Sequence, residues 1–120
     1  MGARVIFNLK QADGMYVSLY SHWGETSMYG DLAHAIYQAR PRWTDESYCT
    51  RIIISNLICP EWASETGFGL WASTEPSHHE TSIEVDMVNK TVIDNTGEHD
   101  WESFVAYHYK AFDKVESAVV

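Results

Sequence analysis

The sequence predicts a single α+β domain in which an antiparallel sheet of about five strands packs on two central helices. Three observations carry this prediction. The 120 residues suit one domain, 45% of them are hydrophobic as in ordinary globular proteins, and segments of alternating apolar residues flank segments of helical spacing. The predicted order is β-β-α-α-β-β-β-α over residues 1–120. Residues 110–120 are expected to continue an amphipathic C-terminal helix as a projecting or oligomerising extension.

Apolar and polar residues alternate in the segments that are expected to form strands. Residues 4–9 and 15–20 alternate on either side of the turn dipeptide Asp13-Gly14, which predicts an antiparallel hairpin. Glu84 and Asp86 alternate with apolar residues, which indicates a strand with one solvated face. Further strands are predicted over residues 67–73, 83–87 and 91–94.

Three segments have the apolar spacing and the end signals of helices. Asp31, Thr44 and Asp100 are suitable N-caps for them. The apolar residues of the second helix wrap more than half of its circumference, so it is expected to be the central core helix. The Ile52-Ile53-Ile54 triplet leaves a buried strand as the alternative, although the length of the run favours a helix. The predicted helices cover residues 31–40, residues 44–59 and the residues from 100 onward.

The chain is strongly acidic. Asp and Glu number 17 against eight Lys and Arg, and the formal charge is −9. This excludes a binder of the nucleic-acid backbone, because such proteins need a basic face. The acidic residues are spread along the chain, which favours simple solubility over a surface that imitates DNA. No apolar run is long enough to predict a membrane span.

The two cysteines lie in one apolar segment. On a helix, Cys49 and Cys59 would be about 15 Å apart, which is too far for a disulfide. Both are therefore expected to be buried, reduced thiols of a cytosolic protein. The first residues lead directly into a strand and lack the apolar region of a signal peptide.

No catalytic signature stands out in the sequence. His78, His79 and Glu80 are adjacent, but no H-x-x-x-H or cysteine-pair spacing accompanies them, which favours a solvated loop over a metal site. Neither a G-x-S-x-G motif nor a phosphate-binding P-loop is present. The sequence therefore predicts no catalytic residue, no metal and no cofactor.

A small-molecule site is the remaining candidate. Arg42, Trp43, Tyr48 and Arg51 gather around the start of the second helix. Arginine offers a planar fork that matches phosphate, and Trp and Tyr offer faces on which a nucleobase stacks. In the alternative interpretation, Trp43 belongs to the core with Tyr48 packed beneath it, and Arg51 pairs with a nearby acid. Composition alone favours that alternative.

The sequence resembles a family of small phage-encoded proteins of unassigned role, over roughly residues 4 to 105. This resemblance implies a phage accessory protein in the cytoplasm of an infected bacterial host. Many such proteins act against host defence, and one class, the sponges, sequesters cyclic or ADP-ribose-type nucleotide signals without cleaving them. The matching residues are Tyr20-Ser21-His22-Trp23-Gly24, Asp31-Leu32, Ala39-Arg40-Pro41-Arg42-Trp43-Thr44-Asp45, Tyr48, Arg51-Ile52-Ile53, Glu65-Thr66-Gly67-Phe68-Gly69 and Ile83-Glu84-Val85-Asp86.

We therefore expect a homo-oligomeric anti-defence protein that binds and sequesters a nucleotide-derived immune signal, with no DNA, RNA or membrane partner. Trp23 or Trp43 would stack on the base, and Arg42 and Arg51 would hold phosphates. His22, Ser21 and Glu65 would bind ribose or amide groups. The expected ligand-binding residues are Ser21, His22, Trp23, Arg42, Trp43, Tyr48, Arg51 and Glu65.

Two alternatives belong to different classes of function. The first is an acidic protein–protein inhibitor of a host defence enzyme, of the anti-CRISPR or anti-restriction type. The second is a metal-dependent nucleotide hydrolase that uses His22, His78 or His79.

Overall fold

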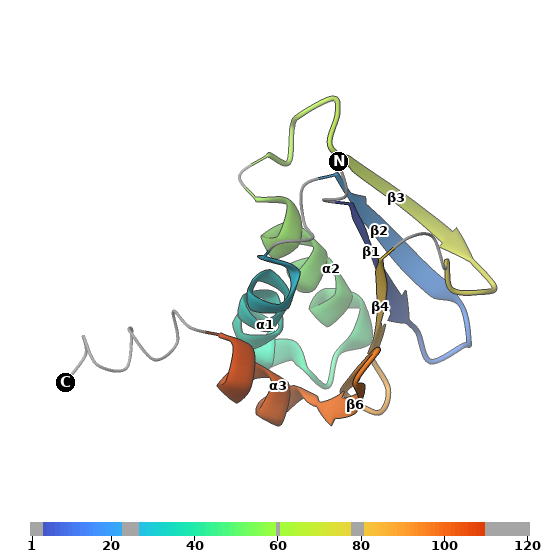
Figure 1. The fold of residues 1–120 in the computed structure, drawn as a ribbon. Coiled ribbons are helices and arrows are strands. Elements are labelled where there is room, and N and C mark those ends of the chain that lie inside the picture. The colour runs from blue at the N-terminus through green and yellow to red at the C-terminus, as the bar shows by residue number, and fades with distance from the viewer. Residues whose placement is uncertain (1–3, 23–26, 60, 78–80, 110–120) are drawn as a thin grey trace.

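The computed structural model describes residues 4–22, 27–59, 61–77 and 81–109. These residues form one six-stranded sheet with α1 and α2 packed on one of its faces, which confirms the predicted α+β class (Figure 1). The strands are β1 (Val5–Lys10), β2 (Tyr16–Ser21), β3 (Phe68–Ser73), β4 (Ser82–Asp86), β5 (Thr91–Asp94) and β6 (Gly97–Asp100). The helices are α1 (Met28–Gln38), the 3-10 turn η2 (Arg40–Arg42), α2 (Glu46–Ile58) and α3 (Trp101–His108).

The sheet is mixed, with the strand order β3-β2-β1-β4-β5-β6. β1 and β4 are parallel, and the other pairs are antiparallel. The prediction of about five antiparallel strands was therefore wrong in detail, because alternation shows that a strand exists but not the direction of its partner. The sequence did not predict β6, because this strand contains no apolar residue. β6 forms as the second strand of a hairpin whose tight turn leads into Gly97, which has a φ of 127°.

The pairing register separates a helix-facing side of the sheet from an outer side. Phe7 pairs with Leu19 in β2 and with Ile83 in β4, and all three are buried against the helices. On the outer side, Ile6 pairs with Tyr20, which in turn pairs with Gly69. Because side chains alternate along each strand, these residues share a face without a helical cover.

The central core helix is α1, not α2 as the sequence predicted. Leu32 and Ile36 are fully buried in α1, whereas most apolar residues of α2 are only partly covered. α1 also begins at Met28, earlier than the expected cap at Asp31. Packing of Tyr29 on α3 explains the earlier start, because its ring stacks on that of His108 at 5.0 Å.

α2 is a helix, as the spacing predicted, but its cap and its end differ from the prediction. Asp45 replaces Thr44 as N-cap, and its carboxylate accepts a hydrogen bond from the backbone N–H of Tyr48. Cys49 is buried, and burial raises the pKa of its thiol to about 11. Cys59 is exposed because it follows the last residue of the helix, so its expected burial was wrong.

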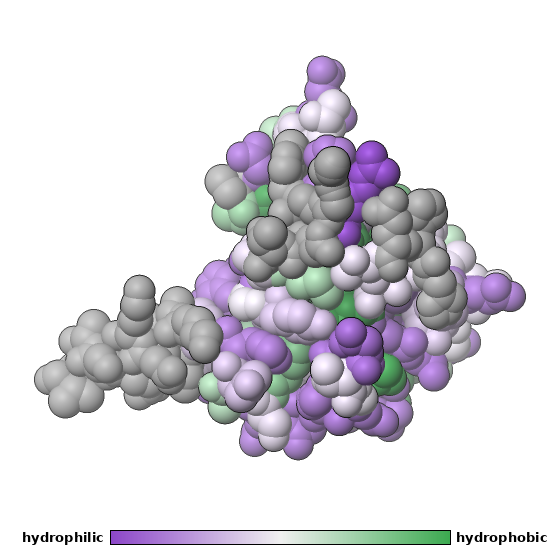
Figure 2. Space-filling model, viewed as in Figure 1, coloured by the Kyte–Doolittle hydropathy of each residue, from purple (hydrophilic) through white to green (hydrophobic). Residues whose placement is uncertain are grey.

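The predicted cap of the last helix is confirmed. The carboxylate of Asp100 accepts a hydrogen bond from the N–H of Ser103 at 2.7 Å, and Trp101 is buried beneath the helix. The expected extension over residues 110–120 lies outside the described residues. In the part of the chain that the structure describes, no helix is long and apolar enough to span a membrane. Hydrophilic residues cover most of the face in view in Figure 2, and apolar residues form small separate areas.

Candidate functional site

A buried polar cluster on the outer side of the sheet fixes the chain segment that follows β3. The amide of Asn8 donates to the carbonyl of Ser77 at 2.9 Å and accepts from the N–H of Ser77 at 3.0 Å. The hydroxyl of Ser18 donates to the same Asn8 oxygen at 2.7 Å. Ser77 lies in the described part of the connection between β3 and β4, and its hydrogen bonds to Asn8 place it on this side of the sheet. Asn8 therefore holds Ser77 over the outer side of the strands.

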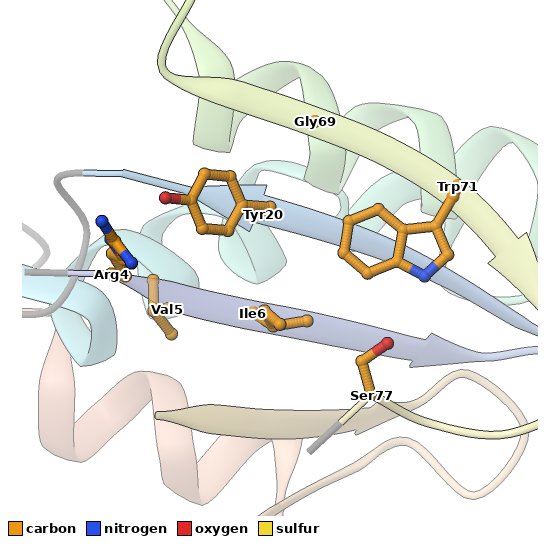
Figure 3. Close-up of a pocket in the computed structure, with 7 residues that line it drawn as sticks. All are labelled: Arg4, Val5, Ile6, Tyr20, Gly69, Trp71 and Ser77. Atoms are coloured by element: carbon orange, nitrogen blue, oxygen red, sulfur yellow. The ribbon is translucent and has the colours of Figure 1, made fainter. Parts of the chain in front are cut away.

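Ser77 lines one side of a hollow that we call the outer-face pocket, with a volume of about 380 Å³ (Figure 3). The volume lies within the range of small-molecule sites, about 300–1,000 Å³. Figure 3 shows the ring of Tyr20 and the indole of Trp71 spread over the strands, with Arg4 beside the hydroxyl end of Tyr20. The lining residues are Arg4, Val5, Ile6, Tyr20, Gly69, Trp71 and Ser77.

Gly69 keeps the space beside the two aromatic rings open. It pairs with Tyr20 across the strands and precedes Trp71 by two residues on the same face. A Cβ atom at this position would stand 3.8 Å from the Cβ of Tyr20, which is ordinary contact, so alanine would fit. A larger side chain would extend into the hollow and cover the aromatic faces.

The first predicted stretch, Tyr20-Ser21-His22-Trp23-Gly24, borders this pocket through Tyr20. The Tyr20 hydroxyl and the Nδ1 of His22 are 3.0 Å apart, and the N–H of His22 donates to the carbonyl of Gly67 at 2.8 Å. Glu65 is exposed in the same loop, two residues before Gly67. Ser21 is buried on the helix-facing side, because it alternates with Tyr20. Trp23 lies outside the described residues.

The second predicted stretch comprises Arg42, Trp43, Tyr48 and Arg51 around the start of α2, and it does not border the outer-face pocket. The indole N–H of Trp43 donates to the carbonyl of Ile36 at 2.9 Å, and its ring meets that of Trp101 edge-on at 5.2 Å. Arg42 lies over the Tyr48 ring at 4.7 Å and pairs with Asp45 at 3.5 Å. Trp43 is thus fixed by packing, although it is half-buried and also lines a hollow of about 340 Å³ with Tyr37 and Arg40. Arg42 already has partners on its own segment.

Arg51 lies on the exposed side of α2, three residues beyond Tyr48. On a helix this spacing makes the two side chains neighbours. Arg51 therefore belongs to the second stretch and not to the outer-face pocket.

The two stretches lie at opposite ends of the β1–β2 hairpin. The carboxylate of Glu46, in the first turn of α2, accepts from the N–H of Ala12 in the hairpin turn. Ser21 pairs with Val5 at the other end, about 17 Å away along β2. In Figure 1, α3, which holds Trp101, lies far from the loop that leads into β3. Among the described residues of one chain, the structure does not bring the two stretches together.

Sequence reasoning missed most of the residues of the outer-face pocket. Only Tyr20 and Gly69 belonged to recognised motifs, and neither was among the expected ligand-binding residues. The alternation of side chains did indicate that Ile6 and Trp71 lie on the outer side of the sheet, because their neighbours along each strand face the helices. The missing information was the strand order that sets β3 beside β2.

Among the described residues, no three His, Cys, Asp or Glu side chains are grouped so that they could hold a metal ion. His78 and His79, the histidines of the hydrolase alternative, lie outside the described ranges. No protein-family model matches the chain, and no match exists among the curated proteins or the solved structures. Function is therefore inferred from the geometry of the site.

Proposed function

We propose that the protein binds and sequesters a nucleotide-derived small molecule in the outer-face pocket. The observation that carries this proposal is the pair of aromatic rings, Tyr20 and Trp71, spread over the pocket with a guanidinium group beside them (Figure 3). Trp71 keeps 37% of its surface exposed although it lies in the middle of a strand. A nucleobase stacked on such a ring contributes about 1–3 kcal/mol.

The charge distribution favours a small anionic ligand over a nucleic-acid strand. Arg4 and the neighbouring His22 supply donors at one end of the pocket, where a phosphate would lie. The rest of the protein is acidic, with a formal charge of −9, and would repel a long polyanion. A mononucleotide, a cyclic nucleotide or an ADP-ribose derivative would place its few charges at this end of the pocket, next to Arg4.

Sequestration requires that the ligand be shielded from water, and a second copy of the chain would supply that cover. β3 is an edge strand without any charged residue, and its Leu70 is 58% exposed. Such edges readily pair with another strand. A homo-oligomer, action against bacterial defence signals and residence in the cytoplasm of an infected host are parts of this proposal and follow the resemblance to phage proteins.

Isothermal titration against cyclic mononucleotides, cyclic dinucleotides and ADP-ribose derivatives tests the proposal. We expect binding of at least one ligand tighter than about 10 μM, and its absence throughout the panel overturns the idea. Chromatography of the ligand after denaturation of the protein distinguishes a sponge from a hydrolase. Intact nucleotide supports sequestration, and a cleaved product supports the hydrolase alternative.

Two tryptophan variants locate the site. Trp71→Ala removes the indole from the pocket and should weaken binding by about tenfold or more. Trp62→Ala is the matched control, because Trp62 is 79% exposed in the loop between α2 and β3 and does not line the pocket. Equal loss in both variants would place the ligand elsewhere.

A second candidate function is inhibition of a host protein. The observation that favours it is the same uncharged edge strand, which offers backbone groups and Leu70 to a strand of another protein. Leu70→Lys should abolish a pulled-down complex with a host enzyme. A purified complex that carries no nucleotide would favour this candidate.

A further inference from the structure

A second cavity, with a volume of about 610 Å³, lies where the β5–β6 hairpin meets α1 and α3. We call it the hairpin cavity. The hairpin contributes Asp94, Thr96 and His99, α1 contributes Tyr29, and α3 contributes Tyr107 and His108. None of these residues lines the outer-face pocket.

Asp94 is the acidic residue of this cavity, and hydrogen bonds hold only one of its two carboxylate oxygens. Oδ1 of Asp94 accepts from the N–H of Thr96 at 2.8 Å and from its hydroxyl at 2.6 Å, and Nε2 of His99 lies 3.4 Å away. The side chain of Asp94 is only 5% exposed. Within the described part of the chain, Oδ2 of Asp94 has no hydrogen-bond partner, so it is left for a ligand.

Asp94 is charged at neutral pH. Burial alone would raise its pKa, but the hydrogen bonds from Thr96 and the neighbouring His99 outweigh burial and hold the pKa below its usual range. Burial, and after it the charge of Asp94, raise the pKa of Tyr29, so the phenol stays neutral. The cavity therefore contains a fixed negative charge beside a neutral aromatic ring.

Aromatic rings from α1 and α3 line the cavity opposite the hairpin. The ring of Tyr29 stacks on His108 at 5.0 Å, and Tyr107 meets His108 edge-on at 4.8 Å. Tyr107 is 76% exposed, although it is large and apolar. Faces of Tyr rings attract organic cations, and no lysine or arginine is among the described residues that line this cavity.

We infer that the hairpin cavity binds a small organic cation, an amidinium or ammonium group carried on a flat apolar body. The cationic group lies at Oδ2 of Asp94, where a planar N–H donor forms a charge-assisted hydrogen bond. The apolar body lies against Tyr29 and Tyr107. An anion would be repelled by the same carboxylate, which distinguishes this site from the outer-face pocket with its arginine.

Titration of the full chain with benzamidine tests this site, with neutral benzamide as the isosteric comparison. We expect benzamidine to bind at least about tenfold more tightly than benzamide. Asp94→Asn keeps the side-chain shape and an oxygen for Thr96, and should remove that preference. Glu98→Gln is the matched control, since it makes the same charge change at an exposed position of the same hairpin.

Tyr107→Ala keeps the test decisive if Asp94→Asn fails to fold, because the exposed Tyr107 can be removed with little loss of stability. It should weaken benzamidine binding by about threefold or more. Equal affinities for benzamidine and benzamide, or an equal loss in Glu98→Gln and Asp94→Asn, would overturn the inference. Nucleotide binding at the outer-face pocket should be unchanged by either hairpin variant, so the two proposals fail separately.

Discussion

Two regions of this molecule combine an arginine with aromatic rings, yet their tryptophans are packed to different extents. At the start of α2, the Trp43 N–H is bound by a backbone carbonyl and its ring is packed on Trp101. On the outer side of the sheet, Trp71 and Tyr20 lie over an open hollow beside Arg4. Residue types therefore indicate only a capacity for binding. Whether a ring face is left accessible is decided by the packing of distant segments.

Among these predictions, the difference in unfolding free energy between the Trp43 and Trp71 variants is the greatest. Trp43→Ala removes a packed ring and leaves the Ile36 carbonyl without its partner, so it should cost about 3 kcal/mol of unfolding free energy. Trp71→Ala should cost less than about 1 kcal/mol, because its ring is partly exposed on an edge strand. Urea unfolding of both variants gives the comparison. A greater loss of unfolding free energy in Trp71→Ala than in Trp43→Ala would show that Trp71, and not Trp43, is the tryptophan that packing holds.

The outer side of the sheet also has a packed end, at Asp86. Its carboxylate accepts from the N–H groups of Val88 and Asn89 at 2.9 Å each and from the Asn89 amide at 3.0 Å. Burial alone would raise the pKa of Asp86, but these hydrogen bonds, together with the charge of Lys10, lower it. A lowered folded pKa stabilises the protein above the unfolded pKa, about 3.9, and this contribution is lost as pH falls through the folded pKa.

Asp86→Asn should therefore destabilise the protein by about 1–2 kcal/mol at neutral pH, because an amide accepts these hydrogen bonds less well than a carboxylate. The difference from the wild type should shrink as the pH is lowered through the acid range. Unfolding curves recorded across that range measure it. Asp13→Asn, an exposed acid in the β1–β2 turn, serves as control. A difference that grows toward low pH would contradict the lowered pKa.

The parts of the structure that local signals determine could be predicted from the sequence. Asp100 caps α3 as expected, and Asp13-Gly14 forms the hairpin turn, in which Gly14 has a φ of 87°. The outer-face pocket could not be predicted in this way. Tyr20 and Trp71 are 51 residues apart, and they meet only because β3 returns to pair with β2 after two helices. Long-range pairing of this kind leaves no trace in a local pattern.

Arg4 and Arg42 should differ in their effect on nucleotide binding, by less than the two tryptophans differ in stability. Arg4→Gln should weaken nucleotide binding by about tenfold, because it removes the donor beside the pocket. Arg42→Gln should leave binding unchanged and cost no more than about 0.5 kcal/mol, since its ion pair with Asp45 is exposed. Titration and urea unfolding of both variants measure the two effects. Weaker binding in Arg42→Gln alone would restore the start of α2 as the ligand site.

The smallest expected effect concerns the two cysteines, which lie near opposite ends of α2. Cys49 is fully buried with a pKa of about 11, so its thiol stays protonated and inaccessible at about pH 8. Cys59 is exposed and should react first. We expect one equivalent of a thiol reagent to be consumed rapidly, the second only on unfolding, and labelling of Cys59 to change the unfolding free energy by less than about 0.5 kcal/mol. Because the folded pKa of Cys49 is raised, its contribution to stability is complete below the unfolded pKa and is lost as pH rises toward 11. Rapid labelling of Cys49 in the folded protein would show that the packed end of α2 opens, and the contrast between the two regions would then fail.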